Sequence, residues 1–408
     1  MNGYRTDKTV AQAVRAEVTP KTKADRAIGE WICLWAGETE RCAKQHSMRT
    51  NFILIFTFHF LATLSPLSTA SDWDRMKDIQ PHGYVCSKAA GPIQIDGDLR
   101  ERSWQAAPWT SYFADIEGVN KTKPRFRTRA KMTWDDQYFY IAAELEEPHV
   151  NATLTQHDSV IFQDNDFEVF IDPNGDNHEY YEIEINALNT EWDLFLKKPY
   201  KDGGKALDSW EIPGLKTAVR IQGTLNDPRD IDKGWSVEIA IPWKVMAEHA
   251  HRSTPPKEGD QWRVNFSRVE WLYEISEGKY RKVPDKKEDN WVWSPQGIID
   301  MHRPEKWGYV QFTSSAAGKV RFKADPSASV RDVLHEIYHA QREFHEKQKQ
   351  WAASLKILGL SDFAKQKLIS PPAIEITPEG FKATAEIKLP VGTTQRWHIT
   401  QDSHIWTK

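Results

Sequence analysis

Hydrophobic and polar residues alternate along most of the chain between Pro92 and Thr313. Runs such as PIQIDG, DFEVFID, YYEIEIN and GWSVEIAIPW are rich in β-branched and aromatic residues, and clusters of Gly, Pro, Asn and Asp separate them. Helical spacing is scarce here, with short candidates at 98–107 and 243–250. Many strands joined by turns, without long helices between them, predict a mainly β fold, an antiparallel β-sandwich or jelly roll over 92–313.

The pattern changes after Asp325. Apolar residues then recur at helical spacing from about 330 to 358, and two strand-like runs, FKATAEIKL and RWHITQDSHIWT, follow. We expect a small α+β appendage over 327–408, whose helix packs on the sandwich or on its own hairpin. His335 and His339 have the i, i+4 spacing of metal ligands, but no third ligand matches nearby. The exposed polar face of an amphipathic helix is therefore the favoured interpretation.

The first seventy residues predict targeting instead of a folded domain. The basic start MRTN, the apolar run FILIFTFHFLATL and the small residues up to Ala70 have the order of a secretory signal over 48–70. Residues 1–47 then precede the true start, and 71–91 form a lead-in to the sandwich. The alternative is a cytoplasmic tail before a signal anchor, although the run is short for a bilayer. We expect an exported protein, periplasmic or extracellular, with no membrane attachment after signal cleavage.

Composition narrows the possible ligands. The net charge of the 408 residues is -4, so nothing favours binding to nucleic acid. Cys86 would be the only cysteine after the signal, which leaves no disulfide framework and no cysteine metal motif. The chain has 18 Trp, 12 Tyr and 17 Phe, whose rings serve core packing and ligand stacking alike.

Alternation divides DFEVFID and YYEIEIN into an apolar and a polar face. Pairing them as a hairpin around PNGDN gathers carboxylates and an amide on one surface, to which the next strand could add Asp193 and Phe195. Carboxylates and amides hydrogen-bond to sugar hydroxyls, while an aromatic ring covers the apolar face of the sugar. The alternative is a solvated outer face, as antiparallel sheets commonly have. The polar face of the hairpin comprises Glu168, Phe170, Asp172, Glu182, Glu184 and Asn186.

Five motifs, in chain order, resemble those of family 9 carbohydrate-binding modules and their relatives of the DOMON type. They are IDGDLRERSW, AKMTWDDQYFYIAAEL, QDNDFEVFIDP, GWSVEIAIPW and PEKWGYVQF, spread over most of 92–313. The resemblance implies a β-sandwich with a concave face, sugar binding by aromatic stacking, and structural calcium.

The resemblance also implies positions for a sugar site. The family's aromatic residue six positions before the Glu of its VE motif falls at Phe162, and the Glu falls at Glu168. Its ligand-binding Arg falls at Glu184, with the charge reversed, and its second Trp falls near Met301. Asn265 belongs to the polar face of QWRVNFSRVEW and joins this set. Among the aromatic residues, Phe170, Phe195, Trp291 and Trp293 are candidate stacking platforms. The expected carbohydrate-binding residues are Phe162, Glu168, Glu184, Asn186, Asn265, Trp291, Trp293 and Met301.

The PNGDN turn is a candidate calcium loop. Asp172, Asn174 and Asp176 repeat oxygen ligands at alternate positions, as calcium loops do. The loop departs from the EF-hand pattern, because Asn177 stands where Gly is expected and no Glu closes it. A plain hairpin turn is the alternative. The expected cofactor is structural calcium, in this loop or elsewhere in the sandwich.

These observations predict an exported, non-catalytic protein that binds an oligo- or polysaccharide. One alternative is a glycosidase or accessory subunit in polysaccharide catabolism, with Glu168 and Glu184 as the carboxylate pair. Another is a scaffold or a haem-binding DOMON-like module, with Met301 and Lys306 as haem ligands. No Ser-His-Asp motif, P-loop or dinucleotide fingerprint occurs in the chain.

Overall fold

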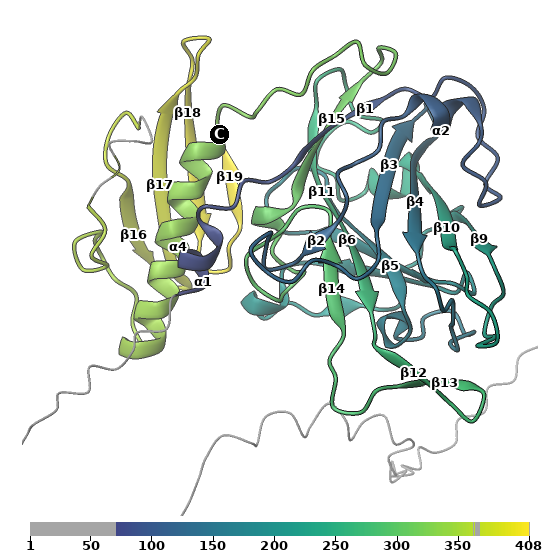
Figure 1. Cartoon of the computed structure of the whole chain (residues 1–408). Helices are drawn as coiled ribbons and strands as arrows, with labels where there is room; N and C mark the ends of the chain where they lie inside the picture. Colours follow the sequence, from purple (N-terminus) through teal and green to yellow (C-terminus); the bar gives the residue numbers. More distant parts are fainter. Residues whose placement is uncertain (1–70, 362, 364–367, 408) are drawn as a thin grey trace, which may run out of the picture. The chain divides into compact units, whose positions relative to one another are not determined.

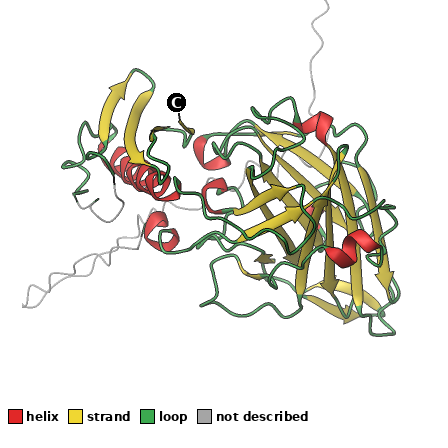
Figure 2. Ribbon diagram, turned by 90° about the horizontal axis from the view of Figure 1, so that it is seen from above, coloured by secondary structure: helices red, strands yellow, loops and turns green. Residues whose placement is uncertain are grey.

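The computed structural model describes residues 71–361, 363 and 368–407. Strands dominate this part of the chain, and the predicted antiparallel β-sandwich is confirmed (Figure 1, Figure 2). The expected extension at 1–47 and the signal peptide at 48–70 lie outside the described residues. Within the described part, no helix combines the length and apolar character needed to cross a membrane.

The larger sheet has nine strands. Neighbouring strands pair antiparallel, except for the parallel pair of β1 with β15. The segment 71–91 is therefore more than a lead-in, because it supplies β1 to this sheet. The order is β1 (Gly83–Ser87), β15 (Gly308–Thr313), β11 (Gln261–Glu270), β5 (Asp166–Asp172), β6 (Tyr180–Asn186), β7 (Glu191–Leu196) and β8 (Ala206–Leu207), with β14 (Asp289–Val292) on β11 and β2 (Ala114–Asp115) on β14.

The second sheet has four antiparallel strands, which lie side by side in Figure 1. The core lies between the two sheets because each strand turns its apolar residues inward: Phe167 and Val169 of the larger sheet belong to one cluster with Ile141 and Val237 of the smaller sheet. The order of this sheet is β3 (Thr128–Trp134), β4 (Tyr138–Glu146), β10 (Gly234–Pro242) and β9 (Lys216–Gln222).

Short elements connect the strands. The helices expected at 98–107 and 243–250 are present but shorter, as α2 (Arg102–Ala106) and α3 (Trp243–Met246). One further short α-helix, three 3₁₀ turns and one small hairpin complete this part of the described chain. They are α1 (Asp72–Met76), η3 (Ile161–Gln163), η4 (Tyr200–Asp202), η5 (Pro304–Lys306), β12 (Tyr273–Ser276) and β13 (Lys279–Lys282).

The C-terminal appendage has its own core. Helix α4 (Ala328–Gln348) packs its apolar face on a four-stranded antiparallel sheet. The helix ends earlier than its apolar pattern predicts, because Lys349 adopts a left-handed conformation with φ of 56°. Later residues such as Trp351 and Leu355 still pack on this core from an irregular segment. The sheet consists of β16 (Ala373–Thr377), β17 (Gly380–Lys388), β18 (Thr394–Thr400) and β19 (Ile405–Thr407).

The histidines of α4 do not form a solvated face. His335 and His339 are 2% and 6% exposed. His335 Nε2 lies 3.0 Å from the side-chain nitrogen of Asn177 in the PNGDN turn, and His339 stacks on Trp73. The expectation of an exposed polar face is therefore wrong at these two positions, because the helix buries that face against other parts of the chain.

Candidate functional site

A cavity of about 280 Å³ opens on the face of the nine-stranded sheet that points away from the core. Strands β5, β6 and β7 form its floor. The loops around residues 116, 162, 200 and 288–302 form its walls. Four predicted site residues line it, namely Phe162, Glu168, Glu184 and Met301. Glu182, Trp192, Tyr200 and His302 line it as well.

The floor of the cavity is strongly acidic because of the strand register. Glu168 of β5 lies directly opposite Glu184 of β6, and Glu182 lies two residues further along the same face. Asp166 continues the row on β5. Carboxylate oxygens of Asp166, Glu168 and Glu184 all lie within 4.8 Å of one another, and all three residues are buried. The lining includes no Lys or Arg among the described residues.

Burial changes the ionisation of these groups. It raises the pKa of Glu168 to about 7, with a further contribution from the nearby charge of Glu288. The pKa values of Asp166, Glu182 and Glu184 rise well above the ordinary range, first through burial and then through the charge of Glu168. At neutral pH part of this cluster is therefore protonated, and a protonated carboxyl group can both donate and accept hydrogen bonds.

Two aromatic rings accompany the acids. Phe162 and Trp192 are stacked, with ring centroids 6.4 Å apart and ring planes inclined by 29°. Both side chains are partly exposed. The backbone N–H of Phe162 donates to a carboxylate oxygen of Glu184 at 2.9 Å, which fixes the loop of η3 to the acidic row. The arrangement combines ring surface with hydrogen-bonding groups, which is the chemistry that sugars require.

Trp192 is a cavity residue that the sequence analysis missed. Alternation led us to expect Asp193 and Phe195 on the polar face of β7. The register pairs Glu184 with Trp192, so Trp192 and Leu194 occupy that face, whereas Phe195 belongs to the core. The run EWDLFL carries large apolar residues in both phases, so alternation alone could not choose between them.

Two predicted stacking residues lie inside the sandwich. Trp291 and Trp293 are each 2% exposed and belong to the cluster between the sheets. Trp291 packs edge-on against Phe126, and the guanidinium of Arg268 lies 5.3 Å from its ring centroid. Neither ring lines the cavity. We therefore correct the expectation that these two residues provide ligand platforms there.

The two predicted amides form local structural contacts instead. Asn186 accepts hydrogen bonds from the backbone N–H groups of Leu188 and Thr190, both at 3.0 Å, and so shapes the turn after β6. Asn265 donates to the carbonyl of Ser294 and accepts from its N–H, each at 2.9 Å. Both side chains are fully buried and neither lines the cavity.

The candidate calcium loop forms a self-bonded turn. Asp172 accepts hydrogen bonds from the backbone N–H groups of Gly175 and Asn177, at 2.8 and 2.9 Å, and the amide of Asn174 donates to Asp176 at 2.6 Å. The carboxylate oxygens that were expected to bind calcium thus accept hydrogen bonds from within the turn. Calcium at Asp172, Asn174 and Asp176 stays a prediction, and the buried oxygens of Asp166, Glu168 and Glu184 form a second group that could hold a cation.

The two suggested haem ligands do not line the same cavity. Met301 contributes to the wall of the acidic cavity. Lys306 donates to the carbonyl of Ile79 at 3.2 Å, and its Nζ lies 4.9 Å from the ring centroid of Trp73.

The fold is a β-sandwich with an acidic, ring-lined cavity on the outer face of its larger sheet. Comparison with known proteins finds a family similar to part of the chain. Residues 95–259 match the model described as "Carbohydrate family 9 binding domain-like". The matched segment is thus similar to family 9 carbohydrate-binding domains, and it contains the first four of the five motifs that carry the resemblance in the sequence.

Two curated relatives match a similar length of chain. The exoglucanase XynX of Acetivibrio thermocellus is 29% identical over 114 residues, which are 28% of this chain and 9% of the relative. The endo-1,4-beta-xylanase A of Thermoanaerobacterium saccharolyticum is 28% identical over 113 residues, 28% of this chain and 8% of the relative. The matched stretch therefore spans less than a tenth of these enzymes.

Two solved structures are also similar. A carbohydrate-binding module of family 9 from Caldicellulosiruptor kristjanssonii, in complex with cellotriose, has a TM-score of 0.39 at 17% identity and covers 60% of this chain and 100% of its own. A putative carbohydrate-binding protein from Bacteroides uniformis has a TM-score of 0.41 at 16% identity, with coverages of 57% and 100%.

Proposed function

We propose that the chain is an exported, non-catalytic carbohydrate-binding protein that holds a sugar in the acidic cavity. One observation carries the proposal. Glu168 and Glu184, directly opposite each other on β5 and β6, line a single cavity together with the stacked rings of Phe162 and Trp192, within a domain of the family 9 type. Export rests on the signal-like run at 48–70.

The chemistry of the cavity fits a sugar ring or the end of a chain. Its volume of about 280 Å³ lies near the lower limit of ligand sites, which measure ~300–1,000 Å³. The ring surfaces of Phe162 and Trp192 would cover the apolar face of the sugar. The carboxyl groups of Glu168, Glu182 and Glu184, partly protonated at neutral pH, would accept from and donate to its hydroxyls.

Hydrolysis is the less favoured alternative for this cavity. A glycosidase pairs one protonated carboxyl group with one ionised carboxylate, ~5–9.5 Å apart on either side of the scissile bond. Here four acids crowd on one floor, and burial raises the pKa of every one, namely Asp166, Glu168, Glu182 and Glu184. Such a cluster lacks the division of labour between acid and base that catalysis requires.

A glycan array probed with the full chain tests the proposal. We expect binding to one class of oligo- or polysaccharide and no release of reducing sugar. Trp192→Ala should weaken binding about tenfold or more, because it removes a stacking surface worth ~1.4 kcal/mol or more. Tyr112→Ala removes an aromatic ring that is 49% exposed and does not line the acidic cavity, and it should leave binding unchanged.

The other outcomes point to the alternatives. Release of reducing sugar that disappears in Glu168→Gln would establish a glycosidase. No glycan binding and no hydrolysis would support a scaffold role. Repeating the array with a calcium chelator tests the predicted structural calcium, since binding that needs calcium should be lost on chelation. Sequencing the N-terminus of the secreted protein tests cleavage after Ala70.

A further inference from the structure

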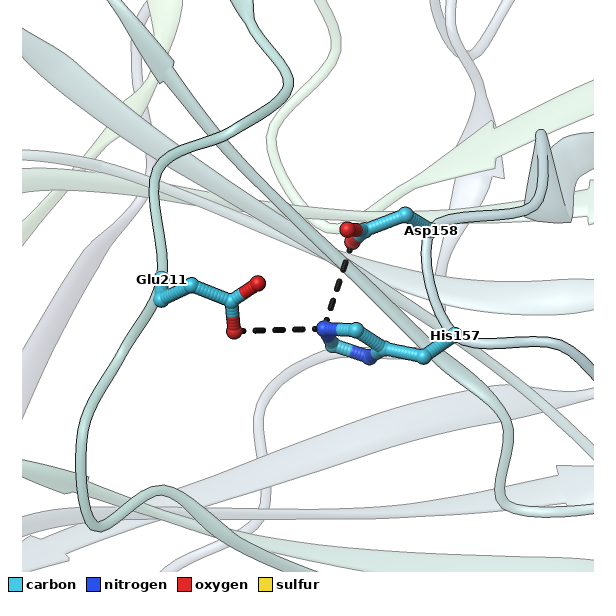
Figure 3. A group of neighbouring side chains, drawn as sticks. All are labelled: His157, Asp158 and Glu211. Carbon is cyan, nitrogen blue, oxygen red and sulfur yellow. Dashed lines mark hydrogen bonds and ion pairs between the residues drawn. The ribbon is translucent and has the colours of Figure 1, made fainter.

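A second group of chemically active side chains lies outside the acidic cavity. His157, Asp158 and Glu211 place one ligand atom each within 4.8 Å of one another. Nε2 of His157 is 3.2 Å from a carboxylate oxygen of Glu211 and 3.4 Å from one of Asp158. Figure 3 shows dashed lines from one nitrogen of the imidazole ring to both carboxylates, which come from different loops. None of the three residues lines the acidic cavity.

Asp193 adds a buried third carboxylate, and so a fourth side chain, to this group. It is 1% exposed, and its Oδ1 lies 3.7 Å from Nε2 of His157. Neither of its oxygens has a hydrogen-bond partner within the described residues, although the backbone N–H of Ile212 faces it. A buried carboxylate without hydrogen bonds is costly unless a cation compensates it. Asp193 therefore indicates that a positive charge belongs at this position.

The fold holds the four side chains at this point from three segments. The backbone N–H of Asp158 donates to the carbonyl of Glu191 at 3.2 Å, which ties the loop of His157 to the start of β7. Asp158 adopts a left-handed conformation with φ of 60°, a feature of a tight turn. Asp193 comes from β7 itself, and Glu211 comes from the segment between β8 and β9.

We propose that His157, Asp158, Asp193 and Glu211 bind one divalent transition-metal cation. Zinc bonds lie at ~2.0–2.2 Å for nitrogen and carboxylate ligands, so two ligand atoms at a tetrahedral angle are about 3.4 Å apart. The separations of 3.2, 3.4 and 3.7 Å around Nε2 of His157 are close to this value. One imidazole with three carboxylates suits Zn²⁺ and its neighbours, whereas Ca²⁺ prefers oxygen ligands alone.

The alternative is an ion pair of protonated His157 with its acidic neighbours. The burial of Asp193 separates the two interpretations. The imidazole of His157 is 43% exposed and lies beside the carboxylates of Glu211 and Asp158. If it were protonated, its single positive charge would be shared among these two groups and the buried Asp193. A single imidazolium facing three carboxylates leaves a net negative charge, whereas a divalent cation with neutral imidazole compensates more of it. The site also joins the loop of η3 to β7, which carry Phe162 and Trp192 of the cavity.

Titration of the metal-free full chain with Zn²⁺ by calorimetry tests the proposal. We expect the unsubstituted protein to bind one more equivalent of Zn²⁺ than His157→Ala or Asp193→Asn does, or to bind that equivalent at least about tenfold more tightly. Saturating Zn²⁺ should raise its melting temperature, because a ligand that binds only the native state stabilises it. Neither substitution should disturb the packing of the fold, because Asp193→Asn preserves the size of a buried side chain and His157→Ala changes an exposed one.

A matched variant controls for surface histidines. His251→Ala removes an exposed imidazole that pairs with Glu179 but belongs to no group of three ligands among the described residues. It should retain the full Zn²⁺ stoichiometry. Equal Zn²⁺ binding by all variants would overturn the proposal, and so would loss of the equivalent in His251→Ala alone. Binding of Ca²⁺ at this position without binding of Zn²⁺ would overturn the assignment of the metal class.

Discussion

The indole N–H of Trp104 donates a hydrogen bond to the carboxylate of Glu238 at 2.5 Å, and both residues are fully buried. The other oxygen of Glu238 accepts from the backbone N–H groups of Asp96 and Gly97, at 2.9 and 2.6 Å. These contacts join the motif IDGDLRERSW to the motif GWSVEIAIPW. Two of the five motifs are therefore joined to each other by buried hydrogen bonds. The residues that form these bonds do not line the acidic cavity.

Replacing Trp104 by Phe should destabilise the fold by roughly 1–3 kcal/mol, because it leaves one oxygen of the buried Glu238 carboxylate without its donor. Urea unfolding followed by circular dichroism measures the change. Trp109→Phe is the matched control, since Trp109 is partly exposed and its ring lies over Arg129 and Lys131 at the surface of the sheet. Equal losses in the two variants would contradict a special role for the bond to Glu238.

Glu168 should make the fold less stable as the pH rises. Its ordinary pKa of 4.5 is raised to about 7 by burial, so the native state holds more protons than the unfolded state between these values. The unfolding free energy therefore decreases as pH rises through this window. Glu168→Gln has no carboxyl group to ionise at this position. Between pH 4 and pH 8 its unfolding free energy should therefore fall by on the order of 1–3 kcal/mol less than that of the unsubstituted protein.

Urea unfolding of both proteins at pH 4 and pH 8 provides the measurement. Glu274→Gln, at an exposed position of β12, is the matched control and should not change the pH profile. Part of the slope should remain in Glu168→Gln, because the pKa values of Glu182 and Glu184 are raised as well. An unchanged pH profile in Glu168→Gln would show that this carboxyl group titrates normally.

Glu184→Arg should lower the pKa of Glu168. Glu184 lies directly opposite Glu168 and its own raised pKa keeps it protonated, so the substitution places a cation across the strand pair from Glu168. Glu184→Gln is the control that replaces the protonated carboxyl group by a neutral amide, and it should leave the pKa of Glu168 nearly unchanged. Carboxyl chemical shifts recorded by NMR against pH measure the titration of Glu168. A pKa that remains about 7 in the arginine variant would refute the close electrostatic contact.

Sequence patterns predicted the parts of this site that depend on one strand or one hairpin. Alternation placed Glu168, Glu182 and Glu184 on one face, and the register confirms it. Alternation did not resolve the phase of EWDLFL, because packing against the core, not local pattern, places Phe195 inside and Trp192 at the cavity. It could not show the burial of Trp291 either, since that depends on the second sheet.

The burial of His335 escaped sequence analysis for the same reason: its partners are distant in the chain. The Asn177 amide lies 2.9 Å from the carbonyl of Ser403 and 3.0 Å from Nε2 of His335, so one side chain of the PNGDN turn contacts both helix α4 and the turn between β18 and β19. Asn177 is 2% exposed and adopts φ of 71°, a conformation that Asn and Gly tolerate.

Asn177→Gly should therefore weaken the contact between the turn and the appendage without straining the backbone. We expect a loss of roughly 1–3 kcal/mol in unfolding free energy, because His335 and Ser403 each lose a buried hydrogen-bond partner. Limited proteolysis should also cut the segment 314–326 faster. Asp285→Gly is the matched control, since Asp285 has φ of 58° in an exposed turn away from the appendage. If both variants lose the same stability, backbone entropy explains the effect and the amide contacts contribute little.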